Sequence, residues 1–158
     1  MLAFECMRIC QAIKPQAAAA LSGDWVSLRN YKRCMIIVHI GQNNVATTAI
    51  TVDKAKTAAG GSESAGITMN NWWSLADFTQ DTDADLYTKG TAAASITSSA
   101  TGADASIYVI DVAAQELGTD YDFLQVVLGA SNAANYVQAT YILYNAAYPQ
   151  ALLPTAVA

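Results

Sequence analysis

The sequence predicts an all-β domain, an antiparallel β-sandwich of jelly-roll type with about eight strands and an extended N-terminal arm. Three observations favour this fold. From residue 24 onward the hydrophobic residues recur mainly with a period of two. Segments rich in branched and aromatic residues alternate with clusters of Gly, Asn, Asp and Ser, which form turns. The length of 158 residues is that of one domain with one core.

The domain boundaries follow from where the period of two begins and ends. Residues 1–21 lack it and contain a proline and an alanine run, so we expect an arm whose conformation depends on what it lies against. The arm is expected to order against a shell or a neighbouring subunit, for example as a strand added to an exposed sheet edge. The sandwich is predicted at residues 22–149 and a proline-containing tail at 150–158, so a chain beginning at Ser22 is expected to fold.

The segment "CMIIVHIG", residues 34–41, predicts a strand that is apolar on both faces. One face contains Cys34, Ile36, Val38 and Ile40, and the other contains Met35, Ile37 and His39. Such a strand is typical of the middle of a sheet, covered by a second sheet on one side and by a subunit or the arm on the other. The turn "GQNNVA" and the alternation in "TTAITVDKAKT" then predict a hairpin partner.

Further strands are predicted along the rest of the chain. They lie in "ITMNNWWSLADF", "SIYVIDV", "YDFLQVVLGA" and "NYVQATYILYNA", which are residues 67–78, 106–112, 121–130 and 135–146. The segment "AAQELGTD" predicts one short helical turn closed by Gly118.

The charge content predicts a permanent assembly. Charged residues make up 13% of the chain and hydrophobic residues 53%, whereas soluble proteins have about 25% charged residues. A surface with so few charges is usually covered by another protein. The net charge of -5 argues against nucleic acid as a partner. The only basic cluster, Arg29, Lys32 and Arg33, is expected to be solvated, at a sheet edge or against an acidic patch of a neighbour.

The three cysteines, Cys6, Cys10 and Cys34, predict neither a disulfide framework nor a zinc site. We expect reduced, apolar side chains in a protein made in a reducing cytoplasm. No stretch approaches the roughly 20 apolar residues of a membrane span, so no membrane partner is expected. Charged residues interrupt the N-terminal apolar segment, which disfavours a signal peptide.

Catalytic chemistry is not expected. His39 is the single histidine and lies within an apolar strand, which favours a core or interface residue over a general base. A hydrolase on this fold would need His39 in a cleft with acids nearby. We therefore predict no enzyme activity, no catalytic residues and no cofactor-binding residues.

Two other motifs are candidate binding sites. "DTDAD" places Asp81, Asp83 and Asp85 at alternate positions, which favours a solvated acidic edge over a calcium site because the EF-hand pattern is not met. No metal site is therefore predicted. Trp72 and Trp73 must point to opposite faces of a strand. A protein interface is favoured over a sugar-stacking platform for the one that is not in the core.

Several segments together resemble a family of small structural proteins of tailed phages. They are "GDWVSLRNYKRCMIIVHIG", "ATTAITVDKAKTAAGGSESAGITM" and "IYVIDVAAQELGTDYDFLQVVLGASNAANYVQATYILYNAAYPQ". The family pattern looks like "G-D-[YW]-V-S-L-K-N-Y", then a "T-L-x-Q-A" strand, then a closing "Y-x-x-x-Y-I-L" strand with a Pro-containing tail. The match covers about residues 22–149, and "TVDKAKTA" departs from the second element.

The resemblance implies a virion protein that decorates and cements the capsid. Its expected partners are the major capsid protein and itself, as a homotrimer on threefold or quasi-threefold axes. Its expected location is the capsid exterior, after assembly in the cytoplasm of the host bacterium. The alternative is a binding module of head- or tail-fibre type, in which the region around Trp72 and Trp73 contacts a host glycan.

Overall fold

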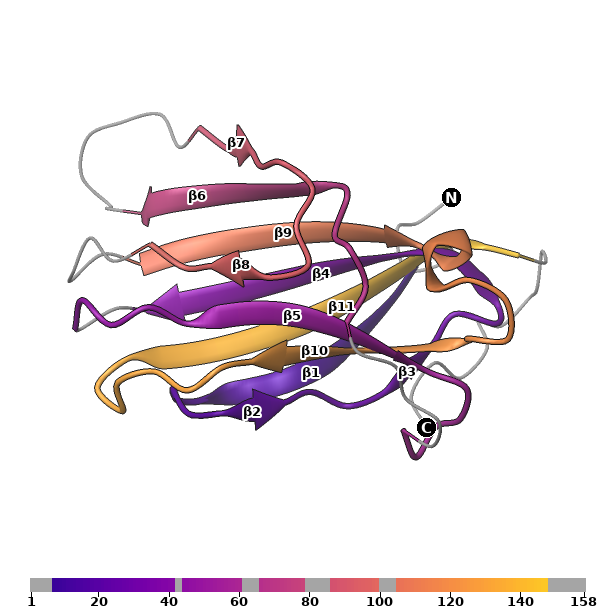
Figure 1. The fold of residues 1–158 in the computed structure, drawn as a ribbon, viewed down its shortest axis with the longest axis horizontal. Helices are drawn as coiled ribbons and strands as arrows, with labels where there is room; N and C mark the ends of the chain where they lie inside the picture. Colours follow the sequence, from indigo (N-terminus) through magenta and orange to yellow (C-terminus); the bar gives the residue numbers. More distant parts are fainter. Residues whose placement is uncertain (1–6, 42–43, 61–65, 79–85, 100–104, 148–158) are drawn as a thin grey trace.

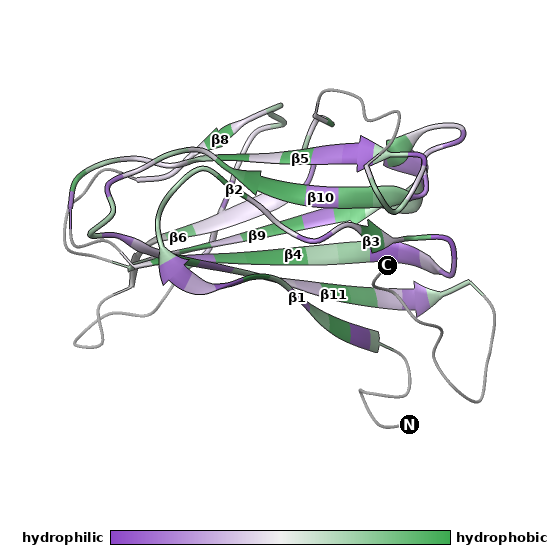
Figure 2. Ribbon diagram, turned by 90° about the horizontal axis from the view of Figure 1, so that it is seen from below, coloured by the Kyte–Doolittle hydropathy of each residue, from purple (hydrophilic) through white to green (hydrophobic). Residues whose placement is uncertain are grey.

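Two antiparallel sheets packed face to face form the protein (Figures 1 and 2). The structure is a computed structural model, which describes residues 7–41, 44–60, 66–78, 86–99 and 105–147. The predicted all-β sandwich is confirmed. In the described part of the chain the one helical element is the short 3-10 helix η1, Ala114–Leu117, and no helix there is long and apolar enough to cross a membrane.

The larger sheet has six strands in the order β1-β11-β4-β9-β6-β7. Their bounds are Met7–Ala17 for β1, Tyr136–Ala146 for β11, Tyr31–Gly41 for β4, Ala105–Ala113 for β9, Trp72–Phe78 for β6 and Thr88–Lys89 for β7. Strand β4 therefore lies in the middle of this sheet, as its two apolar faces predict. The helical turn predicted before Gly118 is also confirmed as η1, and Gly118 ends it with a φ of 82°.

The smaller sheet has the order β2-β10-β5-β8, and a short strand, β3, also pairs with β10. The bounds are Leu21–Ser22 for β2, Val26–Ser27 for β3, Phe123–Leu128 for β10, Ala49–Ala55 for β5 and Ile96–Thr97 for β8. Three of these five strands, β2, β3 and β8, are only two residues long. This sheet therefore rests mainly on the pairing of β10 with β5.

The core lies between the sheets and follows the predicted alternation. Every second residue of the central strands points inward and is almost fully buried. On β4 these residues are Cys34, Ile36, Val38 and Ile40; on β9 they are Ser106, Tyr108, Ile110 and Val112; on β10 they are Leu124, Val126 and Leu128. Burial of such apolar side chains is the main stabilising contribution in a fold of this kind.

A fully buried tyrosine, Tyr141 on β11, joins the two sheets through its hydroxyl group. The hydroxyl accepts a hydrogen bond from the backbone N–H of Val126 at 2.8 Å and donates one to the carbonyl of Asp24 at 3.0 Å. Burial raises the pKa of Tyr141 far above its ordinary value, so the donating proton is retained. The residue therefore holds the larger sheet against β10 and against the segment before β3.

The prediction of an arm over residues 1–21 is wrong for Met7–Ala17, because this segment forms β1, an edge strand of the larger sheet. This strand pairs with β11 of the same chain and contributes Cys10, Ala12 and Ile13 to the core. Two register shifts, at Gln11/Ile13 and Ile13/Gln16, interrupt the alternation. Because bulges break the period of two, the segment did not have the sequence pattern of a strand. Residues 1–6 and 148–158, with the predicted tail, lie outside the described residues.

The predicted hairpin of β4 with β5 is also wrong, because the two strands belong to different sheets. Between them the chain crosses from one sheet to the other, and the N–H of Asn44 donates to Oδ1 of Asn135 at 2.9 Å. Nearby, Thr48 and Ser98 exchange two hydrogen bonds, of 2.7 and 2.8 Å. The same Gly and Asn residues suit a tight hairpin and a crossing between sheets, so the turn sequence alone did not distinguish the two.

Candidate interaction surface

The outward side of the six-stranded sheet is unusually apolar. Residues of five neighbouring strands contribute to it, and we call this set the outer apolar face. Its members are Ile9, Met35, Ile37, Trp73, Leu75, Ile107, Val109 and Ile142. All but two of them are half-buried; Leu75 is buried, and Ile9 is 48% exposed.

Strand register places these side chains next to one another. Ile9 of β1 pairs with Ile142 of β11, which pairs with Met35 of β4. In the next outward row, Ile37 of β4 pairs with Val109 of β9. Val109 in turn pairs with Trp73 of β6. Directly opposed residues have Cβ atoms only about 5 Å apart. The two rows meet on β4, where Met35 and Ile37 are neighbours on the outward side, while Asp111 of β9 and Thr140 of β11 are the other partners of these two residues.

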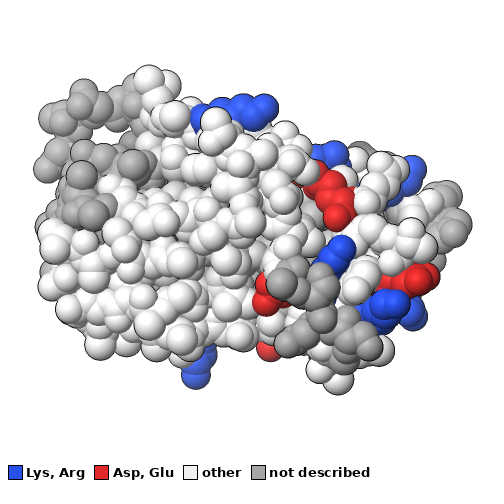
Figure 3. Space-filling view, viewed as in Figure 1, with Lys and Arg blue, Asp and Glu red and all other residues white. Residues whose placement is uncertain are grey.

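The outward side of the smaller sheet has a different composition. Its outward residues include Ser22, Thr51, Asp53, Gln125 and Val127. Figure 3 views the molecule from this side and shows most of the charged side chains over one half, around the end where η1 lies. Antiparallel sheets usually present polar residues to water on their outer side. The smaller sheet follows this rule with hydroxyl and amide groups, whereas the larger sheet departs from it.

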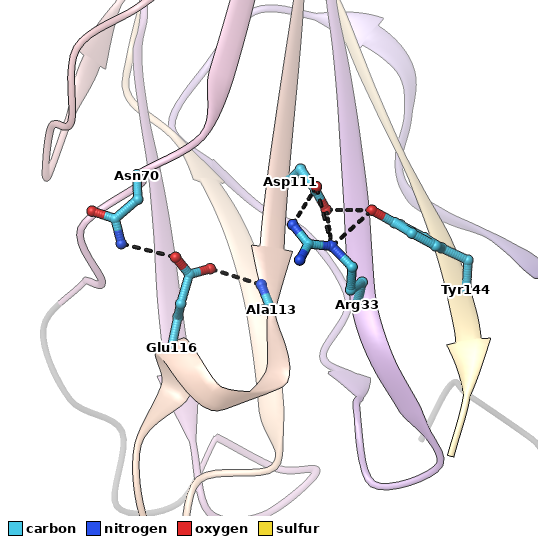
Figure 4. Close-up of polar contacts among 6 residues, drawn as sticks. All are labelled: Arg33, Asn70, Asp111, Ala113, Glu116 and Tyr144. Atoms are coloured by element: carbon cyan, nitrogen blue, oxygen red, sulfur yellow. Dashed lines mark hydrogen bonds and ion pairs between the residues drawn. The ribbon is translucent and has the colours of Figure 1, made fainter. Parts of the chain in front are cut away.

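A polar cluster of Arg33, Asp111 and Tyr144 lies at one end of the outer apolar face, beside the first residues of β4 (Figure 4). Nε of Arg33 lies 3.2 Å from each carboxylate oxygen of Asp111 and donates to the hydroxyl of Tyr144 at 3.0 Å. The Tyr144 hydroxyl donates to Asp111 at 2.7 Å. Hydrogen bonding to Asp111 raises the pKa of Arg33. The two charges neutralise each other within one chain.

A second polar contact fixes the loop next to this cluster. Glu116 of η1 accepts a hydrogen bond from the Asn70 side chain at 2.8 Å and one from the N–H of Ala113 at 2.7 Å. Figure 4 shows that these contacts connect the end of β9 to the segment before β6. Hydrogen bonds of Glu116 therefore connect η1 to the segment before β6 at this end of the outer apolar face.

His39 lies at the opposite end of the same face, on β4. It lines a hollow of about 170 Å³ together with Pro15, Gly41, Tyr136, Val137 and Gln138. Burial lowers the pKa of His39 below its ordinary value of 6.5. Among the described residues that line this hollow there is no carboxylate, so the acids that a hydrolase would need are not found there beside His39.

This environment predicts a pH dependence of folding stability. Because the folded protein binds a proton on His39 less readily than the unfolded chain, stability should be fully present above pH 6.5 and should decrease as the pH falls toward the lower, folded-state pKa. Denaturant unfolding at pH 7.5 and 5.5 measures this change. His39→Gln, which removes the titrating group, should flatten the dependence in this window, and an unchanged slope in the variant would contradict the assignment.

The other motifs singled out in the sequence lie in different places. Trp72 packs against the core and its indole N–H donates to the carbonyl of Thr91 at 2.7 Å, while Trp73 belongs to the outer apolar face. The prediction that the two tryptophans point to opposite faces is confirmed. Lys89 lies over the Trp73 ring, 5.9 Å from its centroid. Asp81, Asp83 and Asp85 lie outside the described residues.

The cysteines and acids form no metal centre in the part of the chain that the structure describes, where no group of three or more possible ligands is present. Cys10 and Cys34 are buried free thiols, and burial raises the pKa of both. Cys6 lies outside the described residues. The two described cysteines therefore act as small apolar residues of the core.

The basic cluster of the sequence is divided by the fold. Arg29 pairs with Asp122, with Nε 2.8 Å from Oδ2, and Arg33 pairs with Asp111. Arg29 and Asp122 lie in the segments next to β3 and β10 of the smaller sheet, whereas Arg33 and Asp111 lie on β4 and β9 of the larger sheet. Lys32 is exposed. The cluster therefore does not form one continuous basic patch for an acidic partner.

Sequence reasoning found only part of the outer apolar face. It recognised that β4 has two apolar faces, but it did not include Ile107, Val109 and Ile142. The segment "SIYVIDV" indicated a second apolar face, because apolar residues occupy both its odd-numbered and its even-numbered positions. The sequence pattern did not show that β9 and β11 lie on either side of β4.

Comparisons with known proteins give information on the fold. No protein-family model and no curated protein matches the sequence. Among solved structures, the SPBc2 prophage-derived protein YomS has a similar fold, with a TM-score of 0.53 and 11% identity over 88% of this chain and 93% of that chain. A protein of Bacillus endospore appendages, which form disulfide-linked pili, gives a TM-score of 0.35 and 10% identity over 90% of each chain.

Proposed function

We propose that this chain is a structural protein of a tailed-phage particle, which decorates the head and stabilises it through protein–protein contacts. The outer apolar face carries this proposal. A contiguous apolar surface on a folded domain is usually covered by another protein, and only 13% of the residues are charged. Such a surface suits a subunit that stays in an assembly, whereas a protein that acts alone would usually have a more polar exterior.

Two further observations support a phage particle as that assembly. The fold is shared with a prophage-derived protein. Several segments also follow, in order, the pattern of small structural proteins of tailed phages. In this proposal the partner is the major capsid protein, the location is the exterior of the capsid, and the role does not include catalysis.

Binding to phage heads tests the proposal. Purified protein is mixed with heads that lack decoration and the mixture is sedimented, with heads that already carry their full complement as the control. We expect saturable binding to the undecorated heads, little binding to the decorated ones, and a higher temperature of head disruption after binding. Failure to sediment with undecorated heads at micromolar protein would contradict the decoration role. Binding to a glycan array instead would favour the fibre-type alternative.

We also propose that the protein is a homotrimer, because threefold and quasi-threefold axes are natural sites for a head-binding protein of this size. Sedimentation equilibrium at micromolar concentration should give three times the 16.7 kDa mass of one chain. A stable, monodisperse monomer would contradict this stoichiometry.

A further inference from the structure

We propose that copies of this chain associate with one another through the outer apolar face, so that the outward side of each six-stranded sheet packs against the same side of its neighbours. This inference takes from the proposed function only the number of associated copies, three. It assigns the self-association to a surface that can be tested without phage heads.

Charge is the first argument for a second copy as the occupant. The central residues of the face are uncharged, and the Arg33–Asp111 pair at its border is neutral overall. A surface that recognises a charged partner normally has an excess of the opposite charge, and this face has none at its centre. Two like faces of this kind do not repel each other, so the surface is compatible with itself.

The size of the surface is the second argument. Five strands spaced by about 4.8 Å, each with about nine residues at 3.3 Å, cover a plane of roughly 24 by 30 Å, on the order of 700 Å². Stable interfaces bury about 800 Å² of accessible surface on each partner. The outward side of the sheet as a whole, which is the outer apolar face together with the polar residues around it, therefore has about the size that a contact between copies requires.

The position of β1 is the third argument. An N-terminal segment could have covered the face of its own sheet, but Met7–Ala17 lies beside β11 as an edge strand and extends the sheet. The same strand adds Ile9, 48% exposed, to the outer apolar face. Within the described residues, this segment thus widens the face and does not cover it.

Threefold packing fits these dimensions. Three sheets about 24 Å wide arranged as a triangular prism lie about 7 Å from the common axis, whereas side chains between packed sheets span about 5 Å per sheet. Large residues on the central strand β4, such as Met35, supply the additional length. Each sheet would face the axis, and the more polar smaller sheet would face outward.

Two matched variants test the surface. Ile37→Lys places a charge at the centre of the outer apolar face, where the copies would bring their lysines close together. Thr51→Lys makes the same addition on the outward side of the smaller sheet, two residues from Asp53 and also at a half-buried position. Both proteins are examined by sedimentation velocity at micromolar concentration, with circular dichroism and a cooperative melt to confirm that each is folded.

We expect the wild type and Thr51→Lys to sediment as the same oligomer and Ile37→Lys to sediment as a folded monomer, with an association constant lowered at least 100-fold. A monomeric wild type, or an Ile37→Lys oligomer as stable as the wild type, would overturn the inference. If Ile37→Lys does not fold, Val109→Gln, a milder change in the same row, takes its place with the same criteria. Head binding by the wild type is measured separately. A wild type that self-associates but does not bind undecorated heads would contradict the proposed function and leave this inference in place.

Discussion

Removal of residues 1–17 is expected to abolish the cooperative unfolding transition of this protein. The deletion removes β1, exposes the edge of the 11-residue strand β11, and takes Cys10, Ala12 and Ile13 out of the core. A long unpaired edge with an apolar face is prone to aggregate. Thermal melts followed by circular dichroism, together with light scattering, measure the loss. A chain beginning at Ala18 that melts as sharply as the full chain would contradict the place of β1 in the core.

A point variant gives a graded form of the same test. Ile13 is 3% exposed and lies between the two register shifts of β1. Ile13→Ala should lower the free energy of unfolding by about 2 to 5 kcal/mol, the usual cost of this truncation in a core. Gln11→Ala, on the same strand but exposed, is the control and should change it by less than about 0.5 kcal/mol. Equal effects would mean that β1 does not pack as described.

Loss of the Tyr141 hydroxyl is expected to be the second large effect. In Tyr141→Phe the ring remains in the core, but the N–H of Val126 and the carbonyl of Asp24 lose their partner. Leaving a buried polar group without a hydrogen bond costs about 1 to 3 kcal/mol. The variant should therefore be less stable by about 2 to 4 kcal/mol in denaturant unfolding, with a midpoint temperature lowered by roughly 5 to 15 °C.

The same change at Tyr144 is the matched control, because it lies three residues further along the same strand. The Tyr144 hydroxyl bonds to Arg33 and Asp111, which also bond to each other. Tyr144→Phe leaves that ion pair intact and should cost less than about 1 kcal/mol. If the two variants are equally destabilised, the connection between the sheets does not depend on the Tyr141 hydroxyl.

Most of the strands that the sequence predicted correctly have an uninterrupted alternation; β6, which was also predicted, has one register shift, between Leu75 and Phe78. β4, β9, β10 and β11 each bury one parity of residues between the sheets, so their hydrophobic period is visible without a structure. Strand β1 was missed because two register shifts place Ala12 and Ile13, neighbours in sequence, both in the core. Local pattern reflects burial only where the pairing is regular.

The candidate surface was harder to predict than the strands, for a topological reason. The two apolar faces of β4 indicated that something covers each side. The neighbours that extend the outward side are β9 and β11, which are about 70 and 100 residues away in sequence, as the pairs Ile37↔Val109 and Met35↔Ile142 show. Pairing between distant strands is set by the whole fold, so neither the outer apolar face nor the Arg33–Asp111–Tyr144 cluster is visible in any one segment.

The central claim is that the outer apolar face is covered in the assembled protein, and hydroxyl-radical footprinting read by mass spectrometry tests it most directly. Wild type is compared with Ile37→Lys, using exposed Tyr87 and core residue Met69 as references. We predict that Met35 and Trp73 are oxidised several-fold more slowly in the wild type than in Ile37→Lys, while Tyr87 and Met69 react alike in both. Equal oxidation of Met35 and Trp73 in the two proteins would show that the face is open and would contradict the claim.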